Sequence, residues 1–226
     1  MHSPAHALQT VLQAIDNAAE AAGRPRPRLL AVSKTKPAEA VRELALAGQQ
    51  AFGENYVQEA IAKREALADL ALEWHLIGRL QSNKAREAAA CFDWVQSVDR
   101  PALVAALDRH RGALGAAPLN VLVQVNVDGE AGKAGCTPEV LPALAAAVAA
   151  APALRLRGIM AITEPFPEHE RRRDSFRRLR ALFEALRDAH PAVDTLSMGM
   201  SGDFELAIAE GATMIRIGTA LFGARV

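Results

Sequence analysis

The stretch Arg28-Leu-Leu-Ala-Val-Ser-Lys34-Thr-Lys-Pro37 joins a short apolar run to a lysine and then to a proline. The run Leu29–Ser33 predicts a buried β-strand, and Pro37 suits the first turn of a following helix. Lys34 is therefore expected at the C-terminal end of a buried strand. Burial disfavours the ammonium form, and a neutral amine attacks an aldehyde, so this position suits a Schiff-base lysine. The alternative is a strand-end lysine whose ammonium reaches water.

The same pattern recurs along the chain. Short runs rich in Val, Ile and Leu alternate with longer stretches in which apolar residues are spaced by three and four, as in amphipathic helices. The predicted strands are Leu29–Ser33, Gln50–Gly53, Glu73–Gly78, Asp93–Val98, Asn120–Val127, Leu156–Ile162, Thr195–Met198 and Thr213–Ile217.

Eight strands, each followed by a helix, predict an α/β fold in the form of a closed (β/α)8 TIM barrel. An open doubly wound sheet is the alternative. No linker, repeat or change of composition divides the chain, so residues 1–226 are expected to form a single domain. An extra helix, about Ala5–Ala22, precedes the first strand. We expect it to plug the bottom of the barrel or to support a dimer contact.

Composition excludes several classes of protein. The 26 basic and 26 acidic residues cancel, which gives no overall attraction to nucleic acid or to an anionic membrane. No apolar run reaches the ~18 residues that span a bilayer. Cys91 and Cys136 match no metal or redox spacing and indicate a reducing compartment. The first 23 residues contain no Lys or Arg and do not resemble a targeting peptide, so we expect a cytoplasmic protein.

Polar residues and glycines gather where the predicted strands end. In a TIM barrel, chemistry is found at the C-terminal ends of the strands, so these residues are expected to meet at one rim. The ends carry Ser33-Lys34, Gly53-Glu54-Asn55-Tyr56, His75 with Gly78 and Arg79, Gln124 with Asn126, Ser197–Asp203, and Arg216–Thr219.

The last two strand ends predict a phosphate site. Ser201 and Thr219 offer hydroxyl donors, and both precede helical segments, where an anion is favoured. Glycines let backbone N–H groups approach a ligand closely. The loops after strands seven and eight are also the usual phosphate site of this barrel. The alternative is a pair of ordinary turns, which favour the same residue types. The glycines are Gly199, Gly202, Gly218 and Gly223.

A phosphate site and a Schiff-base lysine on one rim predict pyridoxal 5′-phosphate as the cofactor. Arg216 is expected one strand away from Lys34, because strand eight neighbours strand one in a closed barrel. An arginine only donates hydrogen bonds. Facing the pyridine nitrogen, it would keep that nitrogen unprotonated and weaken carbanion stabilisation. The alternative is a strand-end arginine that pairs with a surface carboxylate.

Six segments in register resemble the pyridoxal phosphate homeostasis protein family, over nearly the whole chain from about Leu29 to Arg225. At position 202 the chain has Gly where many members are polar, and at position 79 it has Arg where relatives are often uncharged. The matching segments are Ala31–Pro37, Phe52–Glu59, Trp74–Gly78, Leu80–Lys84, Ser197–Ser201 and Ile215–Thr219.

The resemblance implies a barrel of the alanine racemase N-terminal type that holds the cofactor as an imine on Lys34. It implies no established catalytic turnover: members bind the cofactor, buffer its pool and pass it to apo-enzymes. We expect a monomer or a weak homodimer and no metal. The positions that match the family's cofactor site are Lys34, Asn55, His75, Ser201, Arg216, Gly218 and Thr219.

Two other functions remain open at this point. A weak racemase or lyase activity would need an acid or base on each cofactor face. The second base of alanine racemases is a tyrosine from a separate domain. The only tyrosine here is Tyr56, after strand two, and His75 is the other proton carrier. The arginines of 171–180 suggest nucleic-acid binding, but acidic residues alternate with them, as in helix-surface ion pairs.

Lys133 supports a separate hypothesis. It lies in Gly132-Lys-Ala-Gly135, after strand five, and glycine flanks would let it approach the barrel mouth. The hypothesis is that it acts as a transient second acceptor of the aldehyde during transfer; the alternative, which the loop position favours, is an ordinary solvated lysine. Lys36 and Lys84 carry weaker versions of the same hypothesis.

Overall fold

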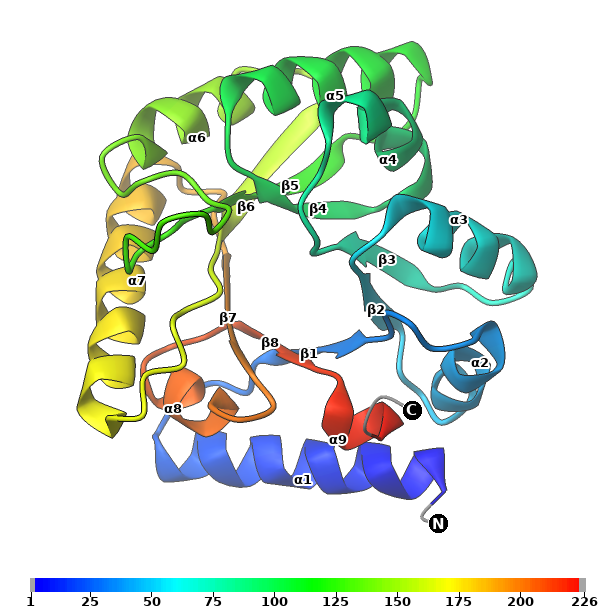
Figure 1. The fold of residues 1–226 in the computed structure, drawn as a ribbon, viewed down its shortest axis with the longest axis vertical. Coiled ribbons are helices and arrows are strands. Elements are labelled where there is room, and N and C mark those ends of the chain that lie inside the picture. The colour runs from blue at the N-terminus through cyan, green and yellow to red at the C-terminus, as the bar shows by residue number, and fades with distance from the viewer. Residues whose placement is uncertain (1–2, 224–226) are drawn as a thin grey trace.

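The eight apolar runs form eight parallel strands that close into a barrel in a computed structural model, which describes residues 3–223 (Figure 1). Parallel strands are buried on both faces, which explains their continuous apolar character. The strands are β1 Arg28–Val32, β2 Ala51–Glu54, β3 Glu73–Leu76, β4 Trp94–Val98, β5 Leu119–Gln124, β6 Leu154–Met160, β7 Thr195–Met200 and β8 Met214–Ile217.

Pairing between the first and last strands closes the barrel. Leu29 of β1 pairs with Ile215 of β8, while Ala31 of β1 pairs with Phe52 of β2. An open doubly wound sheet is therefore excluded, and the predicted TIM barrel is confirmed. The strand ends differ slightly from the prediction. β5 was expected to reach Val127 but ends at Gln124, because the chain leaves the sheet there and Val125 forms only an isolated bridge.

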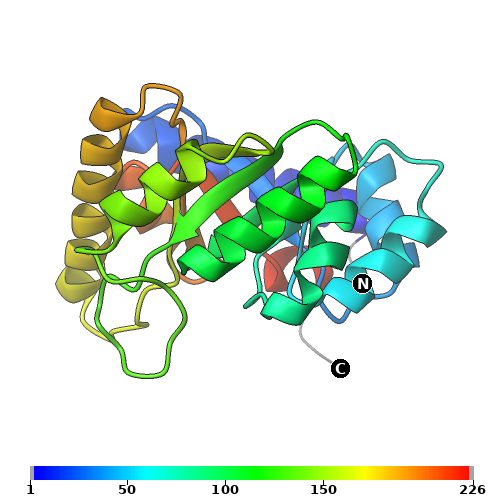
Figure 2. The same ribbon diagram turned by 90° about the horizontal axis from the view of Figure 1, so that it is seen from above.

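Helices form the layer around the sheet (Figures 1 and 2). The loop that follows β5 projects beyond the rest of the barrel in Figure 2. The helical segments are α1 Pro4–Ala21, α2 Ala38–Leu46, α3 Val57–Ala66, η1 Ser82–Lys84, α4 Ala85–Cys91, α5 Pro101–Ala113, α6 Leu141–Ala149, α7 His169–Ala189, α8 Phe204–Ala209 and α9 Thr219–Phe222.

The extra N-terminal helix α1 lies on the outside of the barrel. Its buried residues Leu8, Val11, Ile15 and Ala19 recur every three or four positions and form one apolar face. This face packs against α2, α8 and α9 (Figure 1). The expectation that α1 plugs the bottom of the barrel is therefore wrong. The helices after β7 and β8 are short, and α1 covers the part of the barrel surface that these helices leave exposed.

The barrel interior contains both apolar and polar side chains. Side chains alternate between the two faces of a strand, so every second residue points inward. Two small apolar clusters are separate from the main core between sheet and helices. Buried polar residues from β3, β4, β7 and β8 share the interior with them. The apolar clusters are Leu30, Ala51, Ile77 and Met214, and Trp94, Leu122 and Met160.

Cys91 and Cys136 are buried free thiols in residues 3–223. Burial raises the pKa of each thiol to about 11, which keeps both in the poorly reactive neutral form at neutral pH. Within the same residues, no helix combines the length and apolar character needed to cross a bilayer. The predicted domain ends at 1 and 226, and the end of the family resemblance at Arg225, lie outside the described residues.

Candidate functional site

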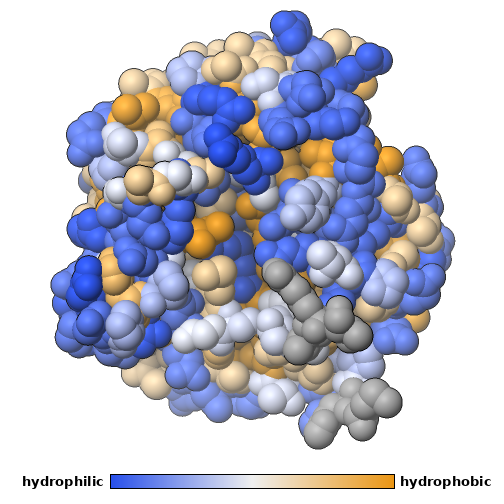
Figure 3. Space-filling model, in the orientation of Figure 1, coloured by the Kyte–Doolittle hydropathy of each residue, from blue (hydrophilic) through white to orange (hydrophobic). Residues whose placement is uncertain are grey.

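A pocket of about 520 Å³ opens at the C-terminal ends of the strands. We call it the barrel-mouth pocket. Figure 3 shows a hollow in the middle of the face seen in Figure 1, with many hydrophilic residues around it. The structure brings six of the seven predicted site residues together in the lining of this pocket: Lys34, Asn55, Ser201, Arg216, Gly218 and Thr219.

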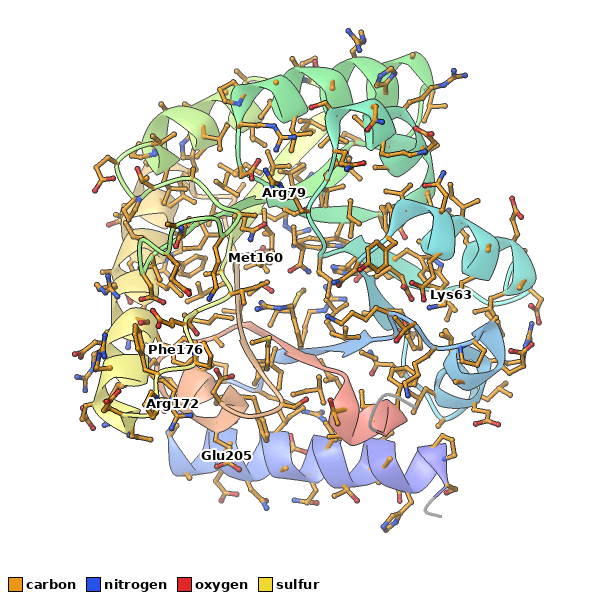
Figure 4. The ribbon with its side chains drawn as sticks, viewed as in Figure 1. Lys63, Arg79, Met160, Arg172, Phe176 and Glu205 are labelled. Carbon is orange, nitrogen blue, oxygen red and sulfur yellow. The ribbon has the colours of Figure 1, made fainter. Side chains whose placement is uncertain are left out.

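The lining of the pocket is positively charged although the protein as a whole is neutral. Its charged members are Lys34, Arg79, Lys133 and Arg216, and its residues include no Asp or Glu. Arg79 comes from the segment after β3 and lies near β4 and β5 in Figure 4. Lys133 is paired with Glu130, which does not line the pocket. A lining with basic side chains and no carboxylate favours an anionic ligand, and the volume is typical of a small-molecule site.

Lys34 reaches the pocket because of its place in the sequence. It follows β1 by two residues and continues the inward-facing series of Leu30 and Val32. Its side chain is half-buried, and Val32 and Ile77 give the pocket wall apolar character. The predicted position at the mouth of the barrel is therefore confirmed for Lys34.

Arg216 is the buried cation of the pocket. It is 3% exposed, and its Nη1 donates to Ser197 Oγ at 2.9 Å while its Nη2 donates to the carbonyl of Ala161 at 2.7 Å. Burial lowers the pKa of the guanidinium to about 10, so it stays protonated at neutral pH. Within residues 3–223 it forms no ion pair with a carboxylate, contrary to the surface-pairing alternative. Its positive charge is left to face the pocket.

His75 does not line the barrel-mouth pocket. Its imidazole is fully buried and stacks on Trp94 with ring centroids 5.1 Å apart. Ile77 and Gly78, which follow it, line the pocket instead. His75 is an inward-facing residue of β3 one layer deeper than expected, because the strand continues past it before the chain turns.

A chain of hydrogen bonds nevertheless joins His75 to Arg216. Gln96 Nε2 lies 2.9 Å from His75 Nδ1, and Ser197 Oγ donates to Gln96 Oε1 at 2.8 Å. Ser197 in turn accepts from Arg216. An amide NH2 only donates, so His75 Nδ1 is the acceptor and the ring is neutral. Its Nε2–H then donates to Glu73 Oε1 at 2.7 Å.

The His75–Glu73 pair makes folding sensitive to acid. Burial lowers the pKa of His75, although Glu73 opposes this shift. Burial would raise the pKa of Glu73, but His75 and Arg28 outweigh it and lower that pKa to about 2. Below pH 6.5, His75 binds a proton in the unfolded chain more readily than in the folded protein. Between about pH 4.5 and pH 2, Glu73 likewise binds a proton more readily in the unfolded chain. Both groups therefore remove stability as the pH falls.

We expect the free energy of unfolding to decrease from pH 6.5 to 5 by up to about 1.4 kcal/mol per pH unit through His75. Substitution His75→Gln removes the titrating ring and should flatten this part of the curve. Urea unfolding at pH 7 and pH 5 measures the difference. The matched control is His169→Gln, at an exposed position of α7, which should keep the wild-type slope. Equal slopes in wild type and His75→Gln would contradict the prediction.

Sequence reasoning overlooked two residues that hold the site. Gln96 was included in a predicted strand but given no role, although a glutamine inside a predicted buried strand was a signal for an interior polar contact. Ser197 was noted only as part of a motif, and it proves to hold Arg216. Lys133 does reach the pocket lining, where it pairs with Glu130, while Lys36 is not among the lining residues. The role of Lys133 as an aldehyde acceptor stays a prediction.

Comparison with known proteins defines the class first. Residues 7–226 match the family model described as "Alanine racemase, N-terminal domain". The chain is 57% identical to the pyridoxal phosphate homeostasis protein of Pseudomonas aeruginosa, over 100% of this chain and 97% of that one. It is 49% identical to the protein of the same name from Escherichia coli K12, over 100% of this chain and 98% of that one.

A solved structure agrees with these relatives. PipY of Synechococcus elongatus PCC7942, described as having PLP bound, is 41% identical and superposes with a TM-score of 0.84. The match covers 97% of this chain and all of that one. The chain therefore belongs to the alanine racemase N-terminal domain family and, within it, to the pyridoxal phosphate homeostasis proteins.

Proposed function

We propose that this protein binds pyridoxal 5′-phosphate in the barrel-mouth pocket, holds it through Lys34, and buffers or delivers it to apo-enzymes in the cytoplasm. The observation that carries the proposal is the presence of Lys34 and the buried cation Arg216 in one pocket without a lining carboxylate. The name of the relatives and the PLP-bound state of PipY support it.

The residues present fit this cofactor. Its phosphate is a dianion, and the charge of the pocket is positive. Ser201, Gly218 and Thr219 lie together in the lining and offer two hydroxyls and backbone N–H groups. Gly218 packs closely on β1, since a Cβ there would lie 3.3 Å from the carbonyl oxygen of Val32. The phosphate group is therefore assigned to this end of the pocket.

Each remaining residue has a definable task. The bound cofactor supplies an aldehyde that condenses reversibly with a primary amine. Lys34 is the amine, and it is half-buried in the lining of the pocket. Arg216 donates hydrogen bonds and accepts none, so it keeps any nitrogen that it faces unprotonated. Asn55, on the opposite side of Lys34 from β8, contributes an amide to the same pocket.

We infer that the protein has no catalytic turnover of its own. Racemisation needs two proton carriers at the reacting carbon. Tyr56 is 61% exposed and does not line the barrel-mouth pocket. His75 is buried beneath it with both ring nitrogens engaged. The described lining of the pocket includes no tyrosine or histidine. Deuterium exchange at the α-carbon of added amino acids is the measurement that would reveal a weak racemase or lyase.

The partners follow from the same proposal. A carrier has to release the cofactor, and an exposed pocket at the barrel mouth suits transfer to an apo-enzyme better than a closed cavity does. We expect the protein to act on apo-enzymes as a monomer or weak homodimer, without nucleic acid or membrane.

The proposal is tested by adding pyridoxal phosphate to the purified protein and recording its visible spectrum. The linked form is then reduced with borohydride, and the labelled peptide is identified by mass spectrometry. A new absorption band and a label confined to Lys34 are the expected result. No band, or labels spread over surface lysines, would overturn the proposal.

A further inference from the structure

A buried ionic cluster lies outside the barrel wall, between β2 and α3. Lys63 of α3 is 5% exposed, and Glu54 at the end of β2 is fully buried. Lys63 Nζ lies 2.7 Å from Glu54 Oε1 and 2.6 Å from Glu59 Oε1. Figure 4 shows Lys63 between α3 and the strands. The rest of this layer is mainly apolar, so a cation with two carboxylates needs an explanation.

The cluster holds the residues on both sides of Lys34. Ser33 Oγ donates to Glu54 Oε1 at 2.5 Å, and Ser33 O accepts from Lys63 Nζ at 2.7 Å. On the other side, the backbone N–H of Thr35 donates to Glu59 Oε1 at 2.5 Å. Lys34 lines the pocket, while the Ser33 side chain and the backbone of Ser33 and Thr35 bond to the cluster behind it.

The turn that carries Lys34 is also strained. Thr35 has φ of 64°, and among residues 3–223 it is the only non-glycine residue with positive φ. This conformation is unfavourable for a β-branched residue and persists only where the surroundings impose it. The bond to Glu59 is on the strained residue itself, and Lys63 holds that carboxylate in place.

We propose that Lys63 and Glu59 are positioning residues for Lys34, which hold the turn of residues 33–35 so that the amine is presented to the aldehyde carbon. The inference rests on the proposed function. It extends the site to residues that lie outside the pocket. If these residues only stabilised the packing of α3 on the barrel, apolar side chains would serve and no charge would have to be buried. The cluster instead makes three short hydrogen bonds to the two residues that flank the reactive lysine, one to the side chain of Ser33 and two to the backbone of Ser33 and Thr35.

The test separates capture from binding. The rate of covalent capture is followed by the absorption band after mixing with pyridoxal phosphate. Affinity without capture is measured with pyridoxine 5′-phosphate, which keeps the ring and phosphate but lacks the aldehyde. We expect Glu59→Ala and Lys63→Met to slow capture roughly 10- to 100-fold, as for a misplaced reacting group. Affinity for pyridoxine 5′-phosphate should stay within about twofold, because the phosphate end is untouched.

Two further variants make the test specific. Glu59→Gln keeps an acceptor oxygen for Thr35 and should restore most of the wild-type rate, with an unchanged pH profile of capture. Arg42→Met removes the ion pair with Asp69, which also connects α2 to the end of α3 but does not touch the turn. It should leave capture unchanged, and circular dichroism should show every variant folded.

The outcomes are distinguishable. If wild type captures the cofactor and Glu59→Ala and Lys63→Met do so at the same rate, the positioning role is wrong. Equal losses in capture and in pyridoxine 5′-phosphate affinity would also overturn it, since they indicate a general loss of structure. If Glu59→Gln captures the cofactor as slowly as Glu59→Ala and its pH profile is shifted, the positioning role is wrong and Glu59 acts through its charge. Absence of capture in wild type would overturn the proposed function itself.

Discussion

Lys34→Ala is expected to lose the absorption band of the linked cofactor completely, and borohydride reduction should leave no label at position 34. The reason is chemical: the Lys34 side chain supplies the amine of the proposed imine. The fold should remain, because Lys34 is half-buried at a strand end and truncation leaves no enclosed cavity. We expect the free energy of unfolding to change by less than about 1 kcal/mol.

The matched control for this experiment is Lys36→Ala. Lys36 lies two residues further along the same turn but is not among the residues that line the barrel-mouth pocket. It should give the wild-type band and the wild-type label at Lys34. A band of full strength in Lys34→Ala, with the label on Lys133 or Lys36, would show that residue 34 is not the amine that the protein depends on.

Gly78→Ala is expected to have the largest effect of any one-methyl change at the pocket. A Cβ at position 78 would lie 2.1 Å from the carbonyl oxygen of Asn55 and 2.6 Å from its Cα. These are backbone atoms at the end of β2, so they cannot rotate away as a flexible side chain would. We expect a loss of about 2–4 kcal/mol in the free energy of unfolding, at or above the usual cost of overpacking.

The loss of stability should be accompanied by a loss of binding. Asn55 lines the barrel-mouth pocket, and displacing its backbone moves its amide. Urea unfolding and cofactor titration measure the two effects. Gly202→Ala is the control, since Gly202 lines the same pocket but a Cβ there would meet nothing within 4 Å. Its stability should stay within about 0.5 kcal/mol of wild type. Equal stability of the two variants would contradict the packing argument.

The barrel was predictable because each of its strands has the same signal in the sequence. A buried parallel strand needs a continuous apolar run, and the chain has eight of them separated by helical spacing. Closure was predicted from that number with an open doubly wound sheet as the alternative, and the pairing of β1 with β8 decides between the two. The place of α1 was not predictable, because its apolar face alone does not say which surface is left uncovered. That depends on the shortness of α8 and α9.

The pocket was predictable where residues follow strands, and less so where they lie within them. Lys34, Ser201 and Thr219 follow strand ends, and the rim of a barrel brings such positions together. His75 lies inside β3, where depth along the barrel axis depends on the stagger of neighbouring strands, which the sequence does not display. The contacts of Glu59 and Lys63 with the turn at Lys34 depend on how α3 docks, and periodicity alone identifies neither partner.

Pairing of β1 with β8 also determines when the site comes into existence. Lys34 and Arg216 stand near opposite ends of the chain, and the wall between them is complete only when the last strand has docked. A ribosome must therefore release almost the entire polypeptide before the two cations can share a ligand. Because the cofactor binds the closed barrel and not the open chain, its presence shifts the folding equilibrium toward closure. Occupancy of such a protein then reports both the supply of cofactor and the integrity of the barrel.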